Sequence, residues 1–261
     1  MTDFIAVFDS GVGGISVLRE MVRLMPEEDF LYFGDSKNAP YGTRTTSEVR
    51  DLTIGHTRDF LARGAKAVTI ACNTATSAAV RDLRRMYPQI PLVGIEPALK
   101  PAVEKYPTGR VLVLATPMTV REKKFHKLLD RWQGDADVIP LAAPGLMDFV
   151  ERGELDTPEL YRFLGELLAA YRVGGYHQVD AVVLGCTHYP FVSAAIGEVL
   201  GEEVELFDGS FGTARELKRR LHEAGLAADP GHKGSVTFEN SAPTPERMEL
   251  CNRLLKTYTN N

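Results

Sequence analysis

The sequence predicts an α/β protein that consists of two pseudo-symmetric domains with mainly parallel sheets. Short apolar runs of strand length alternate with helix-like stretches along the chain of 261 residues. These runs are apolar throughout, which is typical of strands buried on both faces of a sheet. Two of them, Ala67–Cys72 and Ala181–Cys186, resemble each other and both end in a cysteine. This internal similarity favours a chain that consists of two related halves.

The first strand is predicted over Phe4–Phe8, and a helix with Ile15, Leu18 and Val22 on one apolar stripe follows it. Similar buried runs indicate the strands that come next. They begin near Leu31, Ala67, Leu92, Val111, Val138, Val182 and Val204. Alternation of this kind predicts parallel strands that are joined by right-handed crossovers.

Helix-boundary signals lie between the predicted strands. Thr45 and Glu48 form the pattern of a capping box, and Gly64 is placed to end that helix. Pro158 occupies the first position of another helix, which we expect to end at Gly174.

The C-terminal segment departs from this rhythm. Residues 227–232 are rich in turn-forming types, and Ser235–Phe238 predicts one more strand after them. Thr244-Pro245-Glu246 then begins a last helix.

Composition and charge narrow the class of protein. The chain is 44% hydrophobic and carries 30 basic against 35 acidic side chains, a net charge of −5. This weak acidity argues against a nucleic-acid-binding surface and against an electrostatic membrane anchor. The longest apolar runs are strand-sized, far below the roughly 20 residues of a membrane helix, and the N-terminal residues lack the pattern of a signal peptide. We therefore expect a cytoplasmic protein.

The cysteines at the ends of the two similar segments are the candidate reactive groups. Polar residues rather than core residues follow them: Asn73-Thr74 after Cys72, and Thr187-His188 after Cys186. In parallel sheets, ligands bind where strands end. Cys251 lies among apolar residues of the last helix, so we interpret it as a core residue.

Several kinds of chemistry can use a cysteine at such a position. A metal site is disfavoured because Cys186 and His188 form only one compact ligand pair. A single nucleophilic cysteine would leave the second one unexplained. Two thiols on opposite faces of a substrate fit the inversion of a stereocentre, in which one thiolate removes a proton and the other thiol donates one.

Thiols suit this task, because their unperturbed pKa of about 8.5 lets thiol and thiolate coexist near neutrality. We expect a helix N-terminus just after each cysteine to lower that pKa further. Charge that develops on a substrate carboxylate needs hydrogen-bond donors. The polar turns offer Ser10, Asn73, Thr74 and Thr187.

Further motifs extend this pattern over most of the chain, and with them the sequence resembles the glutamate racemases. These are cofactor-independent enzymes that supply D-glutamate for peptidoglycan. The matching segments are Phe8-Asp9-Ser10-Gly11-Val12-Gly13-Gly14, Gly34-Asp35-Ser36, Pro40-Tyr41-Gly42, Ala71-Cys72-Asn73-Thr74-Ala75, Gly94-Ile95-Glu96-Pro97 and Gly185-Cys186-Thr187-His188-Tyr189-Pro190.

The resemblance implies two domains with the active site in the cleft between them. The first would comprise residues 1–98 and 210–261, and the second residues 99–209. Cys72 and Cys186 would be the acid/base thiols, assisted by Asp9 beside one thiol and by Glu151 and His188 beside the other. The resemblance further implies glutamate as substrate, no metal or cofactor, and a homodimer. The residues that would line the substrate are Asp9, Ser10, Tyr41, Gly42, Asn73, Thr74, Thr187 and His188.

Other functions remain open. A related racemase acting on aspartate or a hydantoin would share both thiols. A nucleotide-binding protein could use the glycine bend at Gly11, Gly13 and Gly14, with Asp35 on a ribose, but Ser16 stands where the fingerprint needs its third glycine. A catalytically silent protein of the same fold would not need to keep both cysteines.

The supporting residues also have plainer interpretations. Asp9 could cap the helix that follows it, Tyr41 could be a packing aromatic, and Glu151 could lie at a solvated helix end. The other histidines are interpreted as surface or structural residues: His56, His126, His177, His222 and His232.

Overall fold

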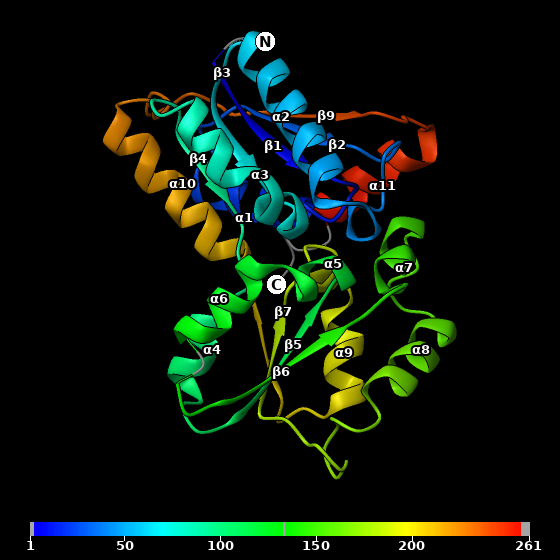
Figure 1. Ribbon diagram of the computed structural model, residues 1–261. Coiled ribbons are helices and arrows are strands. Elements are labelled where there is room, and N and C mark those ends of the chain that lie inside the picture. Colours follow the sequence, from blue (N-terminus) through cyan, green and yellow to red (C-terminus); the bar gives the residue numbers. More distant parts are fainter. Residues whose placement is uncertain (1–2, 133, 257–261) are drawn as a thin grey trace. The chain divides into compact units, whose positions relative to one another are not determined.

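A computed structural model describes residues 3–132 and 134–256, and it divides the chain into two compact units (Figure 1). Unit 1 comprises residues 1–96 and 210–261, and unit 2 comprises residues 97–209. Each unit contains one sheet, and all pairings between the described strands are parallel. The predicted α/β class with mainly parallel sheets is therefore confirmed.

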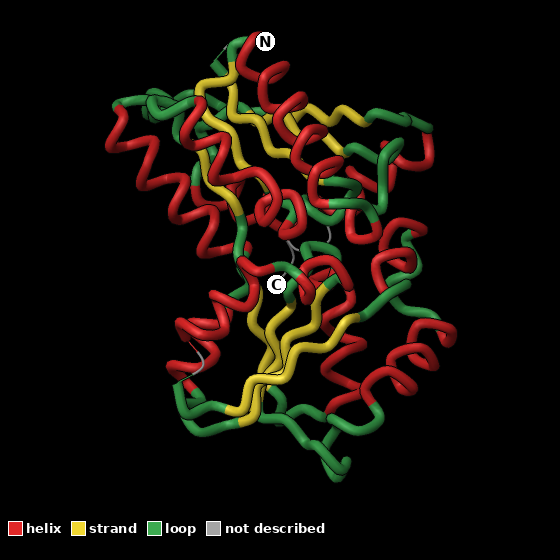
Figure 2. The backbone as a smooth tube through the Cα atoms, in the orientation of Figure 1, coloured by secondary structure: helices red, strands yellow, loops and turns green. Residues whose placement is uncertain are grey.

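The sheet of unit 1 has five strands in the order β4-β3-β1-β2-β9 (Figure 2). The central strand β1 is buried along its whole length, as its unbroken apolar sequence predicts. The strands are β1 (Phe4–Asp9), β2 (Phe30–Gly34), β3 (Ala65–Ile70), β4 (Leu92–Gly94) and β9 (Val236–Asn240).

Helices pack in two groups on this sheet. Helix α1 contacts α10 and α11, whereas α2 contacts α3. The helices of unit 1 are α1 (Ile15–Leu24), the short 3-10 helix η1 (Tyr41–Thr43), α2 (Thr46–Ala62), α3 (Asn73–Met86), α10 (Ser210–Ala224) and α11 (Pro245–Lys256).

Unit 2 has a four-stranded sheet in the order β6-β5-β7-β8. Its core joins buried side chains of β5 and β7 to those of α4 and α6. The strands are β5 (Arg110–Ala115), β6 (Asp137–Ala142), β7 (Ala181–Leu184) and β8 (Glu205–Asp208). The helices are α4 (Leu99–Lys105), α5 (Pro117–Arg121), α6 (Lys123–Trp132), α7 (Leu146–Arg152), α8 (Pro158–Leu168), the 3-10 helix η2 (Tyr189–Val192) and α9 (Ser193–Leu200).

The boundaries predicted for α2 hold, and so does the predicted beginning of α8. The capping box of Thr45 and Glu48 begins α2, and Gly64 follows its end with a positive φ of 93°. Thr157 caps α8, and Pro158 is its first residue. The prediction that this helix runs to Gly174 is wrong, because α8 ends at Leu168 and a series of turns carries the chain onward.

The last segment completes unit 1. Strand β9 pairs in parallel with β2, from Phe30 opposite Val236 to Gly34 opposite Asn240, and α11 follows it. The strand expected over Ser235–Phe238 and the helix expected near Pro245 are thus confirmed. Among the described residues, no helix is both long and apolar enough to span a membrane.

Candidate active site

The carboxyl edge of the unit 1 sheet brings Asp9, Ser10 and Cys72 together. Asp9 ends β1, while Cys72 comes two residues after β3, the neighbouring strand. The Ser10 hydroxyl lies 3.7 Å from the Cys72 sulfur and 3.4 Å from Asp9 Oδ1. Asp9 is fully buried, and its Oδ1 accepts a hydrogen bond from the Gly11 amide at 2.9 Å. The thiol therefore has a hydroxyl next to it and a fixed carboxylate close by.

Gly14 makes this arrangement possible. A Cβ at this position would lie 2.7 Å from the Asp9 Cβ and 2.9 Å from the Ala71 Cβ, which is closer than carbon atoms approach. The glycine bend, for which a nucleotide site was only an alternative interpretation, thus allows α1 to pack against the residues that precede Ser10 and Cys72.

Cys72 is the N-cap residue of α3, so the helix N-terminus expected after this cysteine is present. Partial positive charge at that helix end favours a thiolate. Asn73 and Thr74, the first residues of α3, are buried. Within the described part of the chain, the Asn73 side-chain oxygen is buried without a hydrogen-bond partner, so it remains available to a ligand.

Tyr41 and Gly42 lie in η1, both buried, directly after the cis peptide bond between Ala39 and Pro40. The Tyr41 hydroxyl donates a hydrogen bond to Asp35 Oδ2 at 2.6 Å. Burial and this contact with Asp35 raise the pKa of Tyr41, and the negative charges of Cys72 and Asp9 raise it further. The phenol therefore stays protonated, and its hydroxyl lies within the electrostatic reach of the unit 1 thiol.

In unit 2, Cys186, His188 and Glu151 form a chain of contacts. Cys186 comes two residues after β7, and its sulfur lies 3.6 Å from His188 Nδ1. His188 Nε2 lies 2.8 Å from Glu151 Oε1, which α7 contributes. The cysteine and histidine are 7% and 2% exposed, whereas the Glu151 side chain is half-buried, so water reaches this contact chain only at its carboxylate end.

His188 is positioned to carry a positive charge. Its complete burial would lower its pKa, but hydrogen bonds to Cys186 and Glu151, together with their negative charges, raise the pKa well above the ordinary value. The site thus places a cation between the Cys186 sulfur and the Glu151 carboxylate.

The helix expected directly after Cys186 is absent, and that prediction is wrong. The next described helical residues are those of η2 at Tyr189, and α9 begins only at Ser193. The two segments therefore share the strand, the cysteine and a following helix, but that helix begins at once after Cys72 and only later after Cys186. His188 takes the place of a helix N-terminus as the positive partner.

Each predicted site residue thus lies at the carboxyl edge of its own unit's sheet or contacts a residue there. Asp9, Ser10, Tyr41, Gly42, Cys72, Asn73 and Thr74 belong to unit 1, and Glu151, Cys186, Thr187 and His188 belong to unit 2. Thr187 is 3% exposed.

Sequence reasoning missed Thr116 and Thr119. Both are buried, and their hydroxyl oxygens lie 2.9 Å apart at the start of α5. Leu114 pairs with Leu184 across β5 and β7, and Thr116 and Cys186 each follow this pair by two residues. One signal in the sequence could have indicated Thr116: like the two cysteines, it comes just after a buried strand.

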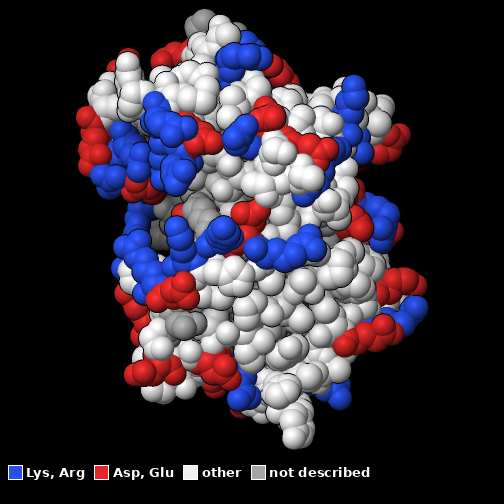
Figure 3. Space-filling model, in the orientation of Figure 1, with Lys and Arg blue, Asp and Glu red and all other residues white. Residues whose placement is uncertain are grey.

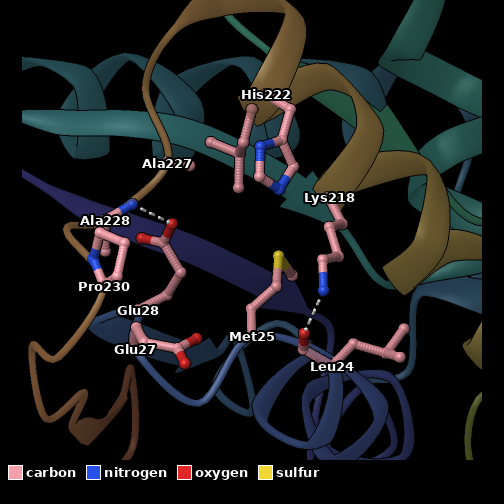
Figure 4. Close-up of a pocket in the computed structure, with 10 residues that line it drawn as sticks. Leu24, Met25, Glu27, Glu28, Lys218, His222, Ala227, Ala228 and Pro230 are labelled. Atoms are coloured by element: carbon pink, nitrogen blue, oxygen red, sulfur yellow. Dashed lines mark hydrogen bonds between the residues drawn. The ribbon is translucent and has the colours of Figure 1, made fainter.

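A separate small pocket of 220 Å³ lies beside α10 in unit 1 (Figure 4). Its polar groups contact one another: the Ala228 amide donates to Glu28 Oε1 at 2.8 Å, and Lys218 Nζ donates to the Leu24 carbonyl at 2.9 Å. None of the predicted site residues line it. The lining residues are Leu24, Met25, Glu27, Glu28, Lys218, Leu221, His222, Ala227, Ala228 and Pro230.

Basic side chains on the surface are interleaved with acidic ones (Figure 3). On α10, Arg219 pairs with Glu216 and Glu223, and Arg220 pairs with Glu216 at 2.7 Å. Arg219 and Arg220 are therefore paired with acidic side chains of the same helix. Over the described residues, no three His, Cys, Asp or Glu side chains are grouped so that they could hold a metal ion.

Comparison with known proteins identifies the family. Residues 5–216 match the model of the Asp/Glu/hydantoin racemase family. The chain belongs to the Asp/Glu/hydantoin racemase family. This membership confirms the family and the enzyme class, racemases, that the sequence predicts.

Individual members of the racemase family resemble the chain over nearly its full length. A glutamate racemase of Clostridium perfringens is 46% identical over 97% of this chain and 96% of its own. The structure of a Thermus thermophilus glutamate racemase, in complex with β-chloro-D-alanine, is 34% identical with a TM-score of 0.82 and covers 97% of this chain and 94% of its own. The structure of the Escherichia coli glutamate racemase, in complex with L-glutamate and an activator, is 28% identical with a TM-score of 0.85 and covers 99% of this chain and 96% of its own.

Proposed function

We propose that this protein interconverts L-glutamate and D-glutamate by proton transfer at two cysteines. One observation carries the proposal: each unit has a buried cysteine just after an inner strand of its sheet, with its own polar and ionisable neighbours. Cys72 has Ser10 and Asp9, while Cys186 has His188 and Glu151. The two units would act on opposite faces of one bound amino acid.

In the proposed reaction, the thiolate of one cysteine takes the proton from Cα of the substrate. A new S–H bond forms, and the electron pair of the broken C–H bond remains on carbon and spreads into the neighbouring carboxylate. The thiol of the other cysteine then gives its proton to the opposite face of Cα and becomes a thiolate. The substrate is neither oxidised nor reduced, and the reverse reaction exchanges the roles of the two sulfurs.

The surrounding residues have separate tasks in this proposal. His188, held by Glu151, stabilises the Cys186 thiolate, and Asp9 and Ser10 assist proton transfer at Cys72. Donors that face the carboxylate stabilise the charge that develops there. We assign that task to Ser10, Gly42, Asn73, Thr74 and Thr187, with Tyr41 and His188 completing the lining.

Glutamate is the proposed substrate, ahead of aspartate and hydantoins. The near-full-length similarity to the Clostridium perfringens enzyme and the L-glutamate complex of the Escherichia coli enzyme support this choice. Purified protein without added cofactor should change the circular dichroism of L-glutamate and of D-glutamate solutions until both reach the same signal. Faster conversion of aspartate or of a hydantoin in parallel assays would overturn the choice of substrate.

Isotope exchange tests the proposed proton transfer. In deuterated water, the enantiomer that forms should carry deuterium at Cα, because the donating thiol exchanges with solvent. Product that keeps the original proton would contradict a mechanism with two exchangeable thiols.

We further propose that the enzyme supplies D-glutamate for peptidoglycan, acts in the cytoplasm and forms a homodimer. The resemblance to glutamate racemases supports these statements. Expression of the chain should restore the growth of a bacterial strain that requires external D-glutamate, and a Cys72→Ser variant should not. Sedimentation of the purified protein as a monomer with and without glutamate would contradict the homodimer.

A further inference from the structure

A carboxylate outside the predicted catalytic set holds the Tyr41 side chain. Asp35 follows β2 and is fully buried. Besides the Tyr41 hydroxyl, it accepts hydrogen bonds from Asn38 Nδ2 at 3.0 and 3.1 Å, and His56 Nε2 lies 3.0 Å from its Oδ2. Asp35 is thus the centre of a network that reaches from β2 to η1 and α2.

Aromatic packing fixes His56, the member of this network that α2 contributes. Its ring, on α2, packs against Phe33 and Phe8, with ring centroids 4.9 and 5.2 Å apart. This packing holds the imidazole at Asp35, so the carboxylate has a charge-assisted partner in addition to the phenol.

The geometry of the network decides where the Tyr41 proton points. At 2.6 Å, the hydroxyl proton is directed at Asp35. Helix η1, which carries Tyr41 and Gly42, contacts α3, whose N-cap residue is Cys72. Without Asp35, the Tyr41 hydroxyl would lose the acceptor that fixes the direction of its proton.

We propose that Asp35 and His56 are positioning residues of the amino-acid site: Asp35 accepts the Tyr41 proton, fixes the Tyr41–Gly42 turn beside Cys72, and is itself held by His56. This inference rests on the proposed function, since it assigns these residues a role in glutamate binding.

A double-mutant cycle tests whether Asp35 acts through the Tyr41 hydroxyl. Asp35→Asn should lower kcat/KM for glutamate about ten- to a hundredfold, mainly by raising KM, because a charge-assisted hydrogen bond that positions a binding turn is lost. In a Tyr41→Phe background, Asp35→Asn should cause no further loss. The matched control Asp51→Asn, on the exposed face of α2, should leave both constants unchanged.

A second variant covers the case in which Asp35→Asn does not fold. His56→Gln leaves the carboxylate in place but removes the imidazole that holds it, so it should raise KM by a smaller factor. This effect too should vanish in the Tyr41→Phe background.

The network also has a readout that does not depend on turnover. Proton NMR should detect the Tyr41 hydroxyl as a downfield, slowly exchanging signal that disappears in Tyr41→Phe and weakens in Asp35→Asn. A wild-type enzyme that converts neither glutamate enantiomer would overturn the proposed function. Additive losses in the cycle, or the absence of the hydroxyl signal from an active enzyme, would overturn the positioning role alone.

Discussion

His188 Nε2 lies 2.8 Å from Glu151 Oε1, and the histidine is only 2% exposed. On its other side, His188 Nδ1 faces the Cys186 sulfur at 3.6 Å. Because both neighbours can carry negative charge, the imidazole is held as a cation at neutral pH. The positive charge beside the Cys186 sulfur is therefore supported by the Glu151 carboxylate through the histidine ring.

Replacing Glu151 with Gln should lower the pKa of His188, because glutamine keeps a hydrogen-bond acceptor but has no charge. Loss of the imidazolium should in turn lower kcat by about 10²-fold, the lower part of the range for acid–base assistance. NMR titration of the histidine ring nitrogens measures the first effect, and polarimetry measures the second. Glu154→Gln is the matched control, since Glu154 pairs with Arg152 at 2.7 Å and should leave the pKa of His188 unchanged.

The same contacts give stability a defined pH dependence. Because the folded-state pKa of His188 is raised, its imidazolium stabilises the folded protein fully below the unfolded pKa of about 6.5. This contribution is lost as the pH rises through the folded pKa. Wild type and Glu151→Gln should therefore differ most in urea unfolding below pH 6.5 and converge in alkaline solution; a constant difference would contradict the assigned charge.

Each catalytic cysteine should be indispensable. Cys72→Ser and Cys186→Ser should each lower kcat by at least about 10²–10⁴-fold, because a serine hydroxyl is too weak an acid to exchange protons near neutrality. Circular dichroism from either enantiomer measures this loss. Near-normal turnover by either variant would remove the basis of the two-thiol mechanism.

Cys251→Ser provides the control for these variants. Cys251 is 2% exposed within α11, so the same chemical change there should affect stability and leave kcat nearly unchanged. A comparable loss of kcat in this variant would mean that serine substitution acts through the fold.

A buried ion pair in unit 1 should be costly to break. Lys66 Nζ lies 2.8 Å from Glu28 Oε2, with side chains 6% and 4% exposed. Lys66→Met should lower the free energy of unfolding by about 3–5 kcal/mol, since it leaves the Glu28 charge buried without its partner. Chemical denaturation measures this change.

Two further variants show how much of the lost unfolding free energy comes from a lone buried charge and how much from the broken ion pair. The double variant Lys66→Met with Glu28→Gln should recover part of the loss, because no lone charge remains. Lys105→Met breaks the exposed pair of Lys105 and Glu205 and should have a much smaller effect. Equal losses of unfolding free energy in Lys66→Met and Lys105→Met would show that burial does not determine the effect of breaking an ion pair.

Asp35 should protect the fold against loss of stability in acid. Burial alone would raise the pKa of Asp35, but hydrogen bonds from His56, Tyr41 and Ser241 lower it overall. Its carboxylate therefore stabilises the fold above the unfolded pKa of about 3.9, and this contribution disappears as the pH falls through the lower folded pKa. Asp35→Asn should be less stable than wild type at pH 7 but approach it near pH 2; urea unfolding at both pH values measures this.

The sequence was sufficient for the inner strands, because buried parallel strands are continuous apolar runs. The expectation of burial was wrong for the edge strands β6 and β8, whose residues are mostly half-buried because an edge strand has a neighbour on one side only. The sequence was also sufficient for Cys72, whose position after β3 follows from the end of such a run. It was not sufficient for the end of α8, because the apolar spacing continues to Tyr171 while the backbone leaves the helix at Leu168. The spacing of apolar residues alone does not show where turns replace the helix.

The partners of the site residues were harder to predict. Glu151 contacts His188 across 37 positions of sequence, and only the packing of α7 beside η2 brings them together. Asp35 and His56 are separated by 21 positions, and neither residue type indicates such a pair. Contacts of this kind depend on how helices return to a sheet, which local patterns do not encode.

The place of β9 in the sheet determines the order in which the two units can complete their folding during translation. Strand β2 lacks its outer neighbour until residues 236–240 have been synthesised, by which time every residue of unit 2 has already left the peptidyl-transferase centre. During translation, the inserted unit can therefore mature first, while the unit that contains the N-terminus waits with an unpaired sheet edge. A truncation that ends before Val236 should thus leave an edge that recruits other chains, and nascent copies of this protein should depend on chaperones until synthesis is almost complete.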